Sequence, residues 1–223
     1  MSDEILHMSW QSPNVERLEG NHVLITRLTP DTDVDDLYEV SHAKEEYKAL
    51  WTYMPYGPFR DKDEMYAWLL SIKDSRDPLF YSILSKEMSR KVGMIAIQNI
   101  NARMRRAELA HVWYGPMAQK TKVNSEVVYL FLRYLFDDLK YRRVEWKCDN
   151  DNIPSKRAAL RIGFAFEGVF RQHMIVKGKN RDTAWYSIID KEWTERKKNF
   201  ERYLSMDGLS LTKLNQVDAN LLP

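Results

Sequence analysis

Apolar residues recur every three to four positions in four segments of the chain, and this spacing predicts helices. The clearest segment is 123–139; weaker ones cover 31–48, 61–74 and 154–162, the last ending at Gly163. The apolar stripe of the first segment consists of Val127, Leu130, Phe131, Tyr134, Leu135 and Leu139. A stripe of this width is typical of a helix that buries one face.

Seven other segments alternate or run apolar in the manner of β-strands. They cover 22–28, 79–86, 91–100, 106–114, 143–148, 164–176 and 183–189. Polar turn residues at 177–180 join the last two into a hairpin. The irregular order of strands and helices predicts a mixed α/β (α+β) fold with one sheet in a single domain, rather than a doubly wound fold.

The two ends of the chain carry weaker patterns. Residues 1–21 show few apolar positions, so we expect an N-terminal extension there. Residues 195–223 begin as a charged helical stretch and continue as a polar tail. The domain itself is therefore predicted to span residues 22–194.

Composition narrows the class of protein. The 223 residues include 34 Lys and Arg against 32 Asp and Glu, and a non-specific nucleic-acid binder needs a stronger basic excess. A single cysteine, Cys148, excludes a disulfide framework, and the histidines lack metal-ligand spacing, so we expect no metal. The chain has no apolar run of about 18 residues and no signal peptide at its start, and together with the single cysteine this predicts a cytoplasmic protein. The oligomeric state stays open between monomer and homodimer.

Aromatic residues make up 12% of the chain, with seven tryptophans and twelve tyrosines. Most of them fall at core spacing, but segment 51–59 contains two prolines and a glycine and cannot form a regular element. Its aromatic residues are Trp51, Tyr53, Tyr56 and Phe59. They form either a small cluster under a loop or the wall of an apolar pocket.

Two polar junctions precede predicted helices. Segment 118–125 lies before the strongest helix, where free backbone N–H groups and the helix dipole favour an anion, although a solvated loop with an N-cap is an equal alternative. In segment 150–155, Asn152 or Ser155 could face a ligand, but such residues are more often helix caps. The chain has no Gly-x-Gly-x-x-Gly or Walker-type run.

Taken together, the order of elements, the turn at 119–124, the Asn152-x-x-Ser155 helix and the closing hairpin resemble the GNAT N-acetyltransferase superfamily. Within it they are most similar to the RimJ/RimL-type branch of ribosomal-protein N-α-acetyltransferases. The resemblance covers most of residues 22–193. It implies a mostly antiparallel, splayed central sheet flanked by helices. It also implies transfer of an acetyl group from acetyl-CoA to a primary amine by direct attack.

The resemblance also implies a cofactor site. In the family, backbone amides of a glycine-containing turn grip the pyrophosphate; here Gln119 matches, while Lys122 and Asn124 stand at the glycine positions. Asn tolerates positive φ and Lys122 adds positive charge, so we expect acetyl-CoA binding to survive. The residues implied in cofactor binding are Val112, Trp113, Gln119, Lys120, Thr121, Lys122, Val123, Asn124, Asn152 and Ser155.

Catalytic and acceptor-binding residues follow from the same resemblance. Ser155 is expected to protonate the leaving thiolate, and Glu108 is the first candidate for the base, because the family's glutamate position is Met174 here. His173 is expected on the opposite strand face from Met174. The residues implied in acceptor binding are Trp51, Tyr53, Tyr56, Phe59, His173 and Met174.

The acceptor remains open between a protein N-terminus and a small-molecule amine. The absence of acidic residues from segment 51–59 argues mildly against a polyamine. The alternative to an enzyme is a catalytically weak GNAT-fold protein that acts as a binding module. Lys122, Asn124 and Met174 favour that alternative.

Overall fold

A single sheet of eight strands runs through the computed structural model, which describes residues 10–215. Its strand order is β1-β2-β3-β4-β5-β6-β8-β7, and every neighbouring pair is antiparallel except β5 and β6. The strands are β1 (Arg17–Glu19), β2 (Val23–Arg27), β3 (Leu79–Ser85), β4 (Arg90–Asn101), β5 (Arg106–Tyr114), β6 (Arg143–Asp149), β7 (Ala165–Val176) and β8 (Lys179–Ile189). The mixed α/β class and the mostly antiparallel sheet are confirmed.

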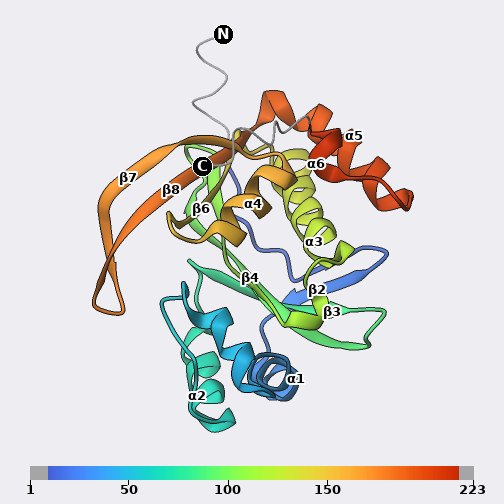
Figure 1. Ribbon diagram of the computed structural model, residues 1–223. Helices are drawn as coiled ribbons and strands as arrows, with labels where there is room; N and C mark the ends of the chain where they lie inside the picture. Colours follow the sequence, from blue (N-terminus) through green and yellow to red (C-terminus); the bar gives the residue numbers. More distant parts are fainter. Residues whose placement is uncertain (1–9, 216–223) are drawn as a thin grey trace.

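Helices cover both faces of this sheet (Figure 1). One face carries α1 (Pro30–His42), the 3₁₀ turn η2 (Glu45–Trp51) and α2 (Lys62–Ile72). The other carries α3 (Lys122–Arg133), its continuation η4 (Tyr134–Asp138), α4 (Ile153–Ile162), α5 (Asp190–Ser205) and α6 (Leu211–Leu214), with the short turn η3 (Pro116–Ala118) leading into α3. None of the helices within 10–215 is long and apolar enough to cross a membrane.

The predicted helix over 31–48 is shorter in the structure. It ends at His42, because Lys44 takes an extended backbone (φ −135°, ψ 149°) and the chain restarts as the 3₁₀ turn η2. That turn brings Trp51, which is fully buried, under the sheet. The restart places the aromatic segment against the core instead of leaving it on the surface.

Both ends of the described chain are built into the fold. Arg17–Glu19 extends the sheet by pairing with β2, and the Glu126 carboxylate on α3 accepts hydrogen bonds from the backbone N–H groups of residues 21–23 at 2.6–2.9 Å. Phe200 on α5 and Leu211 on α6 are buried. The charged helical stretch predicted from residue 195 corresponds to α5, but up to residue 215 the chain after it packs against the domain as α6 instead of continuing as a polar tail. Residues 1–9 and 216–223 lie outside the described residues.

The centre of the sheet is open. β5 and β6 pair only where Arg106–Glu108 meets Arg143–Glu145, and beyond these residues the two parallel strands separate. A bulge in β5 adds to the opening. Ala110 pairs with Ala96 and Trp113 with Met94, so β5 has one residue more than β4 between these two pairs. The sequence pattern placed both strands, but this splay came only from the family resemblance.

Candidate active site

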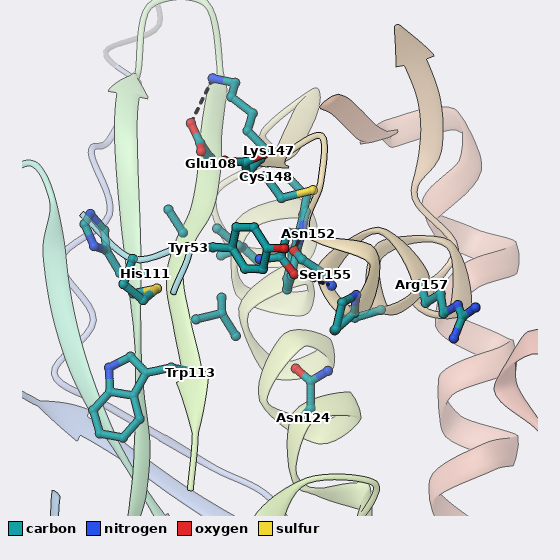
Figure 2. A pocket seen from close by; sticks show the side chains of 18 of the residues that line it. Tyr53, Glu108, His111, Trp113, Asn124, Lys147, Cys148, Asn152, Ser155 and Arg157 are labelled. Atoms are coloured by element: carbon teal, nitrogen blue, oxygen red, sulfur yellow. Dashed lines mark hydrogen bonds and ion pairs between the residues drawn. The ribbon is translucent and has the colours of Figure 1, made fainter. Parts of the chain in front are cut away.

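A cavity of about 1450 Å³ occupies the opening between β5 and β6. Its walls come from β5, the start of α3, β6, α4, the β7–β8 hairpin and the segment after η2. In Figure 2, Asn124 lies at one end of the cavity, Asn152 and Ser155 near its middle, and Glu108 with Lys147 at the other end. The cavity is therefore long and carries different chemistry at its two ends.

The cavity brings together most of the residues that the sequence singled out. Those that line it are Tyr53, Glu108, Val112, Trp113, Gln119, Lys120, Thr121, Asn124, Asn152, Ser155, His173 and Met174. Those whose side chains do not line it are Trp51, Tyr56, Phe59, Lys122 and Val123. Because the members of the first set come from five separate segments, their convergence is the strongest structural indication of a functional site.

The turn before α3 has the form of an anion site. Thr121 caps the helix, its Oγ1 accepting a hydrogen bond from the Val123 N–H at 3.2 Å, and Lys120 adopts a left-handed conformation (φ 61°). Lys122 points away from the cavity, since its Nζ lies 2.7 Å from Asp207 Oδ1. Asn124 Oδ1 is buried at the cavity wall without a hydrogen-bond partner within 10–215. Of the two residues at the glycine positions, Lys122 therefore keeps its side chain out of the cavity, whereas the side chain of Asn124 forms part of the wall.

Positive charge gathers at this end without compensation. Lys120, Arg157 and Arg161 line the cavity, and none has a carboxylate partner among the described residues. Arg161 donates only to Ser125 Oγ, at 2.7 Å, and burial lowers the pKa of its guanidinium. A partly buried cation needs a counter-charge. This end therefore fits a ligand that carries phosphates, such as CoA.

The middle of the cavity holds the start of α4. Asn152 caps the helix by accepting a hydrogen bond from the Ser155 N–H at 3.1 Å, so part of its role is the cap that the sequence offered as the plainer interpretation. Ser155 Oγ accepts a hydrogen bond from Trp146 Nε1 at 3.0 Å, which leaves the hydroxyl hydrogen free to donate. Cys148 is buried nearby in β6, and burial raises the pKa of its thiol.

Glu108 dominates the far end and is almost fully buried. One oxygen, Oε2, accepts hydrogen bonds from Lys147 Nζ at 2.8 Å and from Asn99 Nδ2 at 2.7 Å. The other oxygen, Oε1, has no hydrogen-bond partner within the described chain. Lys147 also lies 2.9 Å from Glu145 Oε2 and 3.9 Å from the centre of the Trp185 ring. Glu108 is thus a charge-paired carboxylate with one oxygen left for a ligand.

Lys147 was missed at the sequence level. The alternation of β6 places Arg143, Glu145 and Lys147 on one polar face of a central strand, and that face was the available signal. The charges continue outward, because Arg143 donates to Glu145 at 2.8 Å and to Glu167 at 2.7 Å. Burial alone would raise the pKa of Glu145, but the hydrogen bonds from Arg143 and Lys147 outweigh it and hold that pKa below its ordinary value.

The aromatic segment divides between core and cavity. Trp51 and Phe59 are buried in the cluster beneath α1 and α2, so the cavity wall predicted from these two residues is wrong. Tyr53 does line the cavity, and its hydroxyl donates to the carbonyl of Asp151 at 3.0 Å. From the hairpin tip, Lys177 Nζ donates to the carbonyls of Trp51 and Gly57 at 2.8 and 2.6 Å. These contacts fix the segment above the cavity from two sides.

His111 sits in the bulge of β5 and was not singled out as a site residue. Its Nε2 lies 3.2 Å from the amide oxygen of Gln98, which can only accept, so Nε2 carries the hydrogen and Nδ1 accepts from Tyr56 Oη at 3.3 Å. Burial lowers the pKa of His111 to about 4 and raises that of Tyr56 above its ordinary value. The pair is therefore neutral at pH 7, and the left-handed backbone of His111 (φ 53°) marks a strained position.

His173 and Met174 both line the cavity, so the expectation of opposite faces is wrong. The ladder to β8 steps from Phe170 directly to Met174, which leaves three residues of β7 opposite one of β8. Within this irregular stretch Gln172 adopts a left-handed conformation (φ 50°). The strand period of two is lost there, and the side chain of His173 turns inward to Thr183 Oγ1 at 3.0 Å.

Comparisons with known proteins agree with this geometry. The family model described as "Acetyltransferase (GNAT) domain" matches residues 22–165. The crystal structure of a GCN5-related N-acetyltransferase from Brucella melitensis superposes with a TM-score of 0.87 at 33% identity, covering 93% of this chain and 98% of that one. The "Putative ribosomal N-acetyltransferase YdaF" of Bacillus subtilis is 29% identical over 105 residues, 47% of this chain but only 57% of that protein.

A more distant structure adds information on the fold alone. The microcin C7 self-immunity acetyltransferase MccE, solved in complex with acetyl-CoA and AMP, superposes with a TM-score of 0.67 at 19% identity. The match covers 76% of this chain and 93% of that one. At this level of identity the likeness concerns the fold alone.

Proposed function

The chain belongs to the GNAT acetyltransferase family, and from that premise we propose that it transfers the acetyl group of acetyl-CoA to a primary amine. The observation that carries the proposal is one continuous cavity with uncompensated cations at one end and a carboxylate with a free oxygen at the other. The first end suits the phosphates of the cofactor, and the second suits an ammonium group. Ser155 lies between them in Figure 2.

The cofactor would be held by backbone and side chain together. The N-terminal amides of α3 and the charge of Lys120 face the pyrophosphate in this proposal, with Lys122 contributing its backbone only, because its side chain is engaged by Asp207. Asn152 and the backbone of β5 at Val112 and Trp113 would hold the pantetheine arm. When bound, acetyl-CoA supplies an acetyl thioester, which is the activated form of the group to be transferred.

The residues of this chain would take part in two proton transfers, one from the amine and one to the departing thiolate. An α-amine has a pKa of about 7.7–8.0 and a lysine side chain about 10.4, so an amine must lose a proton before it can attack near pH 7. Oε1 of Glu108 is the candidate to accept that proton, directly or through water, because Oε2 is already used by Lys147 and Asn99. The free hydroxyl hydrogen of Ser155 is the candidate to protonate the departing sulfur.

We propose a protein N-terminus or a small-molecule amine as the acceptor. The segment that carries Tyr53 and the hairpin tip at Lys177 close over the acceptor end, which favours a slender primary amine. An α-amine fits the chemistry better than a lysine side chain because less proton affinity has to be overcome. The relative from Bacillus subtilis is named a putative ribosomal N-acetyltransferase, and that name supports the first alternative.

The test is a transfer assay with purified protein and acetyl-CoA. The acceptors are peptides with free N-termini, a lysine peptide blocked at its N-terminus, amino acids, aminoglycosides and polyamines. Thiol release gives the rate, and mass spectrometry locates the acetyl group. We expect α-amines to outperform lysine side chains at pH 7. Binding of acetyl-CoA with no transfer to any amine would contradict the proposal and favour the binding-module alternative.

Two variants test the roles of individual residues in the same assay. We expect Glu108→Gln to lower kcat about 100-fold or more at pH 7 and Ser155→Ala about 10-fold or more, as for the loss of an acid or base. Glu167→Gln is the matched control, because it removes a carboxylate from the same chain of charges without touching the cavity. An unchanged rate and pH profile in Glu108→Gln would remove that residue from the mechanism.

A further inference from the structure

The two C-terminal helices reach the cofactor end of the cavity. Tyr203 on α5 and Thr212, within α6, are among its lining residues, although the family match stops at residue 165. Helices α5 and α6 lie beside α3 and α4 (Figure 1). This part of the wall therefore comes from a C-terminal segment that lies beyond the residues matched by the family model.

The added wall is firmly built. Asn199 Nδ2 donates to the Leu214 carbonyl at 2.9 Å and to Asn215 Oδ1 at 3.1 Å, and Asn215 Nδ2 donates to the Arg161 carbonyl at the end of α4 at 3.0 Å. Phe200 is fully buried in the main core. The backbone of Arg161 is thus tied to the C-terminal helices, while its guanidinium faces the cavity.

The chemistry of this corner is an aromatic ring beside an unpaired cation. Tyr203 is partly buried, and its hydroxyl has no hydrogen-bond partner within 10–215. Arg161 has Ser125 Oγ as its one side-chain partner and no carboxylate within the described chain. A planar ring and a guanidinium together match a base and a phosphate.

We propose that Arg161 and Tyr203 bind the phosphorylated adenosine part of acetyl-CoA, so that α5 and α6 form part of the cofactor site. This rests on the proposed function, because it takes CoA as the ligand of the cavity. The pantetheine arm lies on the other side of the α3 turn in this arrangement, against Asn152 and β5. The two parts of the cofactor are then held by different segments of the chain.

Calorimetric titration of the full-length protein can separate the two parts. The probes are CoA, adenosine 3′,5′-bisphosphate and pantetheine, titrated into wild type, Arg161→Gln and Tyr203→Leu. We expect both variants to weaken CoA and adenosine 3′,5′-bisphosphate by about 10-fold or more, as for the loss of a charge-assisted hydrogen bond or a stacking contact. The affinity for pantetheine should stay within twofold. Arg202→Gln, on the exposed side of α5, is the control and should match wild type for all three probes.

The outcomes also separate this inference from the proposed function. Wild-type affinities retained in both variants, with unchanged thermal unfolding, would overturn the inference even if acetyl transfer is observed. Equal weakening of CoA and pantetheine would overturn it as well, since it would indicate general damage to the cavity. Arg161→Lys, which keeps the charge, should recover part of the lost CoA affinity. A protein that binds CoA in this pattern but acetylates no amine would keep the inference and lose the proposed function.

Discussion

The two ends of the cavity treat charge in opposite ways. At the acceptor end the Glu108 carboxylate is paired with Lys147, which also contacts Glu145. At the cofactor end Lys120 and Arg161 face the cavity with no carboxylate partner within 10–215. One end carries a closed network, and the other an excess of positive charge.

The difference separates structural charge from ligand-binding charge. Removing one partner of a buried ion pair is destabilising whether or not a ligand is bound, because the other charge is left buried alone. A cation with no partner gains its counter-charge only when an anion arrives. The acceptor end should therefore respond to substitution mainly in stability and catalysis, and the cofactor end mainly in ligand affinity.

The largest effect is expected when Lys147 is removed from its ion pairs with Glu108 and Glu145. Lys147→Met leaves Glu108 and Glu145 buried without the ammonium group between them, and we expect the free energy of unfolding to fall by about 3–5 kcal/mol. Urea denaturation at pH 7 measures the loss. Lys197→Met is the control: its ion pair with Asp137 is more exposed, so the loss should stay below about 1 kcal/mol. Equal losses of unfolding free energy in both variants would show that the buried ion pairs of Lys147 contribute no more to stability than the exposed pair of Lys197.

A smaller effect tests the neutral imidazole at the acceptor end. The pKa of His111 is about 4 in the folded protein because the ring is buried, against 6.5 for an unperturbed histidine. The unfolded chain therefore binds the extra proton first as the pH falls. The contribution of His111 to stability is present above pH 6.5 and is lost between pH 6.5 and about 4, by roughly 2 kcal/mol after allowing for the partly exposed ring.

Comparison with a variant isolates this histidine from the carboxylates. His111→Asn keeps a residue that accepts a left-handed backbone, so the bulge in β5 should persist. Unfolding free energies of both proteins are measured at pH 7 and pH 4.5. We expect the wild type to lose about 1–2 kcal/mol more than the variant over this interval. Identical losses would mean that His111 titrates normally in the folded protein.

Local patterns in the sequence predicted most elements and part of the site. Period and capping located α3, α4 and the strands, and the turn at 119–124 and the Asn152–Ser155 segment were singled out by position alone. These features depend on neighbours in the chain, which a sequence displays directly. The site as a whole needed contacts between distant segments, such as Lys147 with Glu108 across two strands.

The errors have a common physical source. His111 and Gln172 adopt left-handed backbones inside strands. Non-glycine residues seldom take this conformation, and the sequence around these two residues gives no signal for it. The second of these bulges turned His173 into the cavity against the strand period. Trp51 went into the core because a 3₁₀ turn replaced the end of the predicted helix. Each error follows from a break in local periodicity that tertiary packing stabilises.

The smallest expected effect concerns the hydrogen bond between Tyr53 and Asp151, near the middle of the cavity. The Tyr53 hydroxyl donates to the Asp151 carbonyl and so links the acceptor segment to the loop before α4, in an exposed position. Removing one such hydrogen bond costs about 0.5–1 kcal/mol at most, so Tyr53→Phe should leave global stability nearly unchanged. Because the bond positions the acceptor wall, we expect KM for the amine to rise about two- to threefold. KM for acetyl-CoA should not change.

Tyr66→Phe is the matched control for this last effect. Its hydroxyl donates to Asp31 on the far side of α1 and α2, and Tyr66 does not line the cavity. Both KM values should therefore equal those of the wild type. A rise in KM for acetyl-CoA in Tyr53→Phe would contradict the division, because it would mean that the acceptor wall and the cofactor site respond as one unit. If only the KM for the amine rises, the hydrogen bond between Tyr53 and Asp151 acts on acceptor binding and not on cofactor binding.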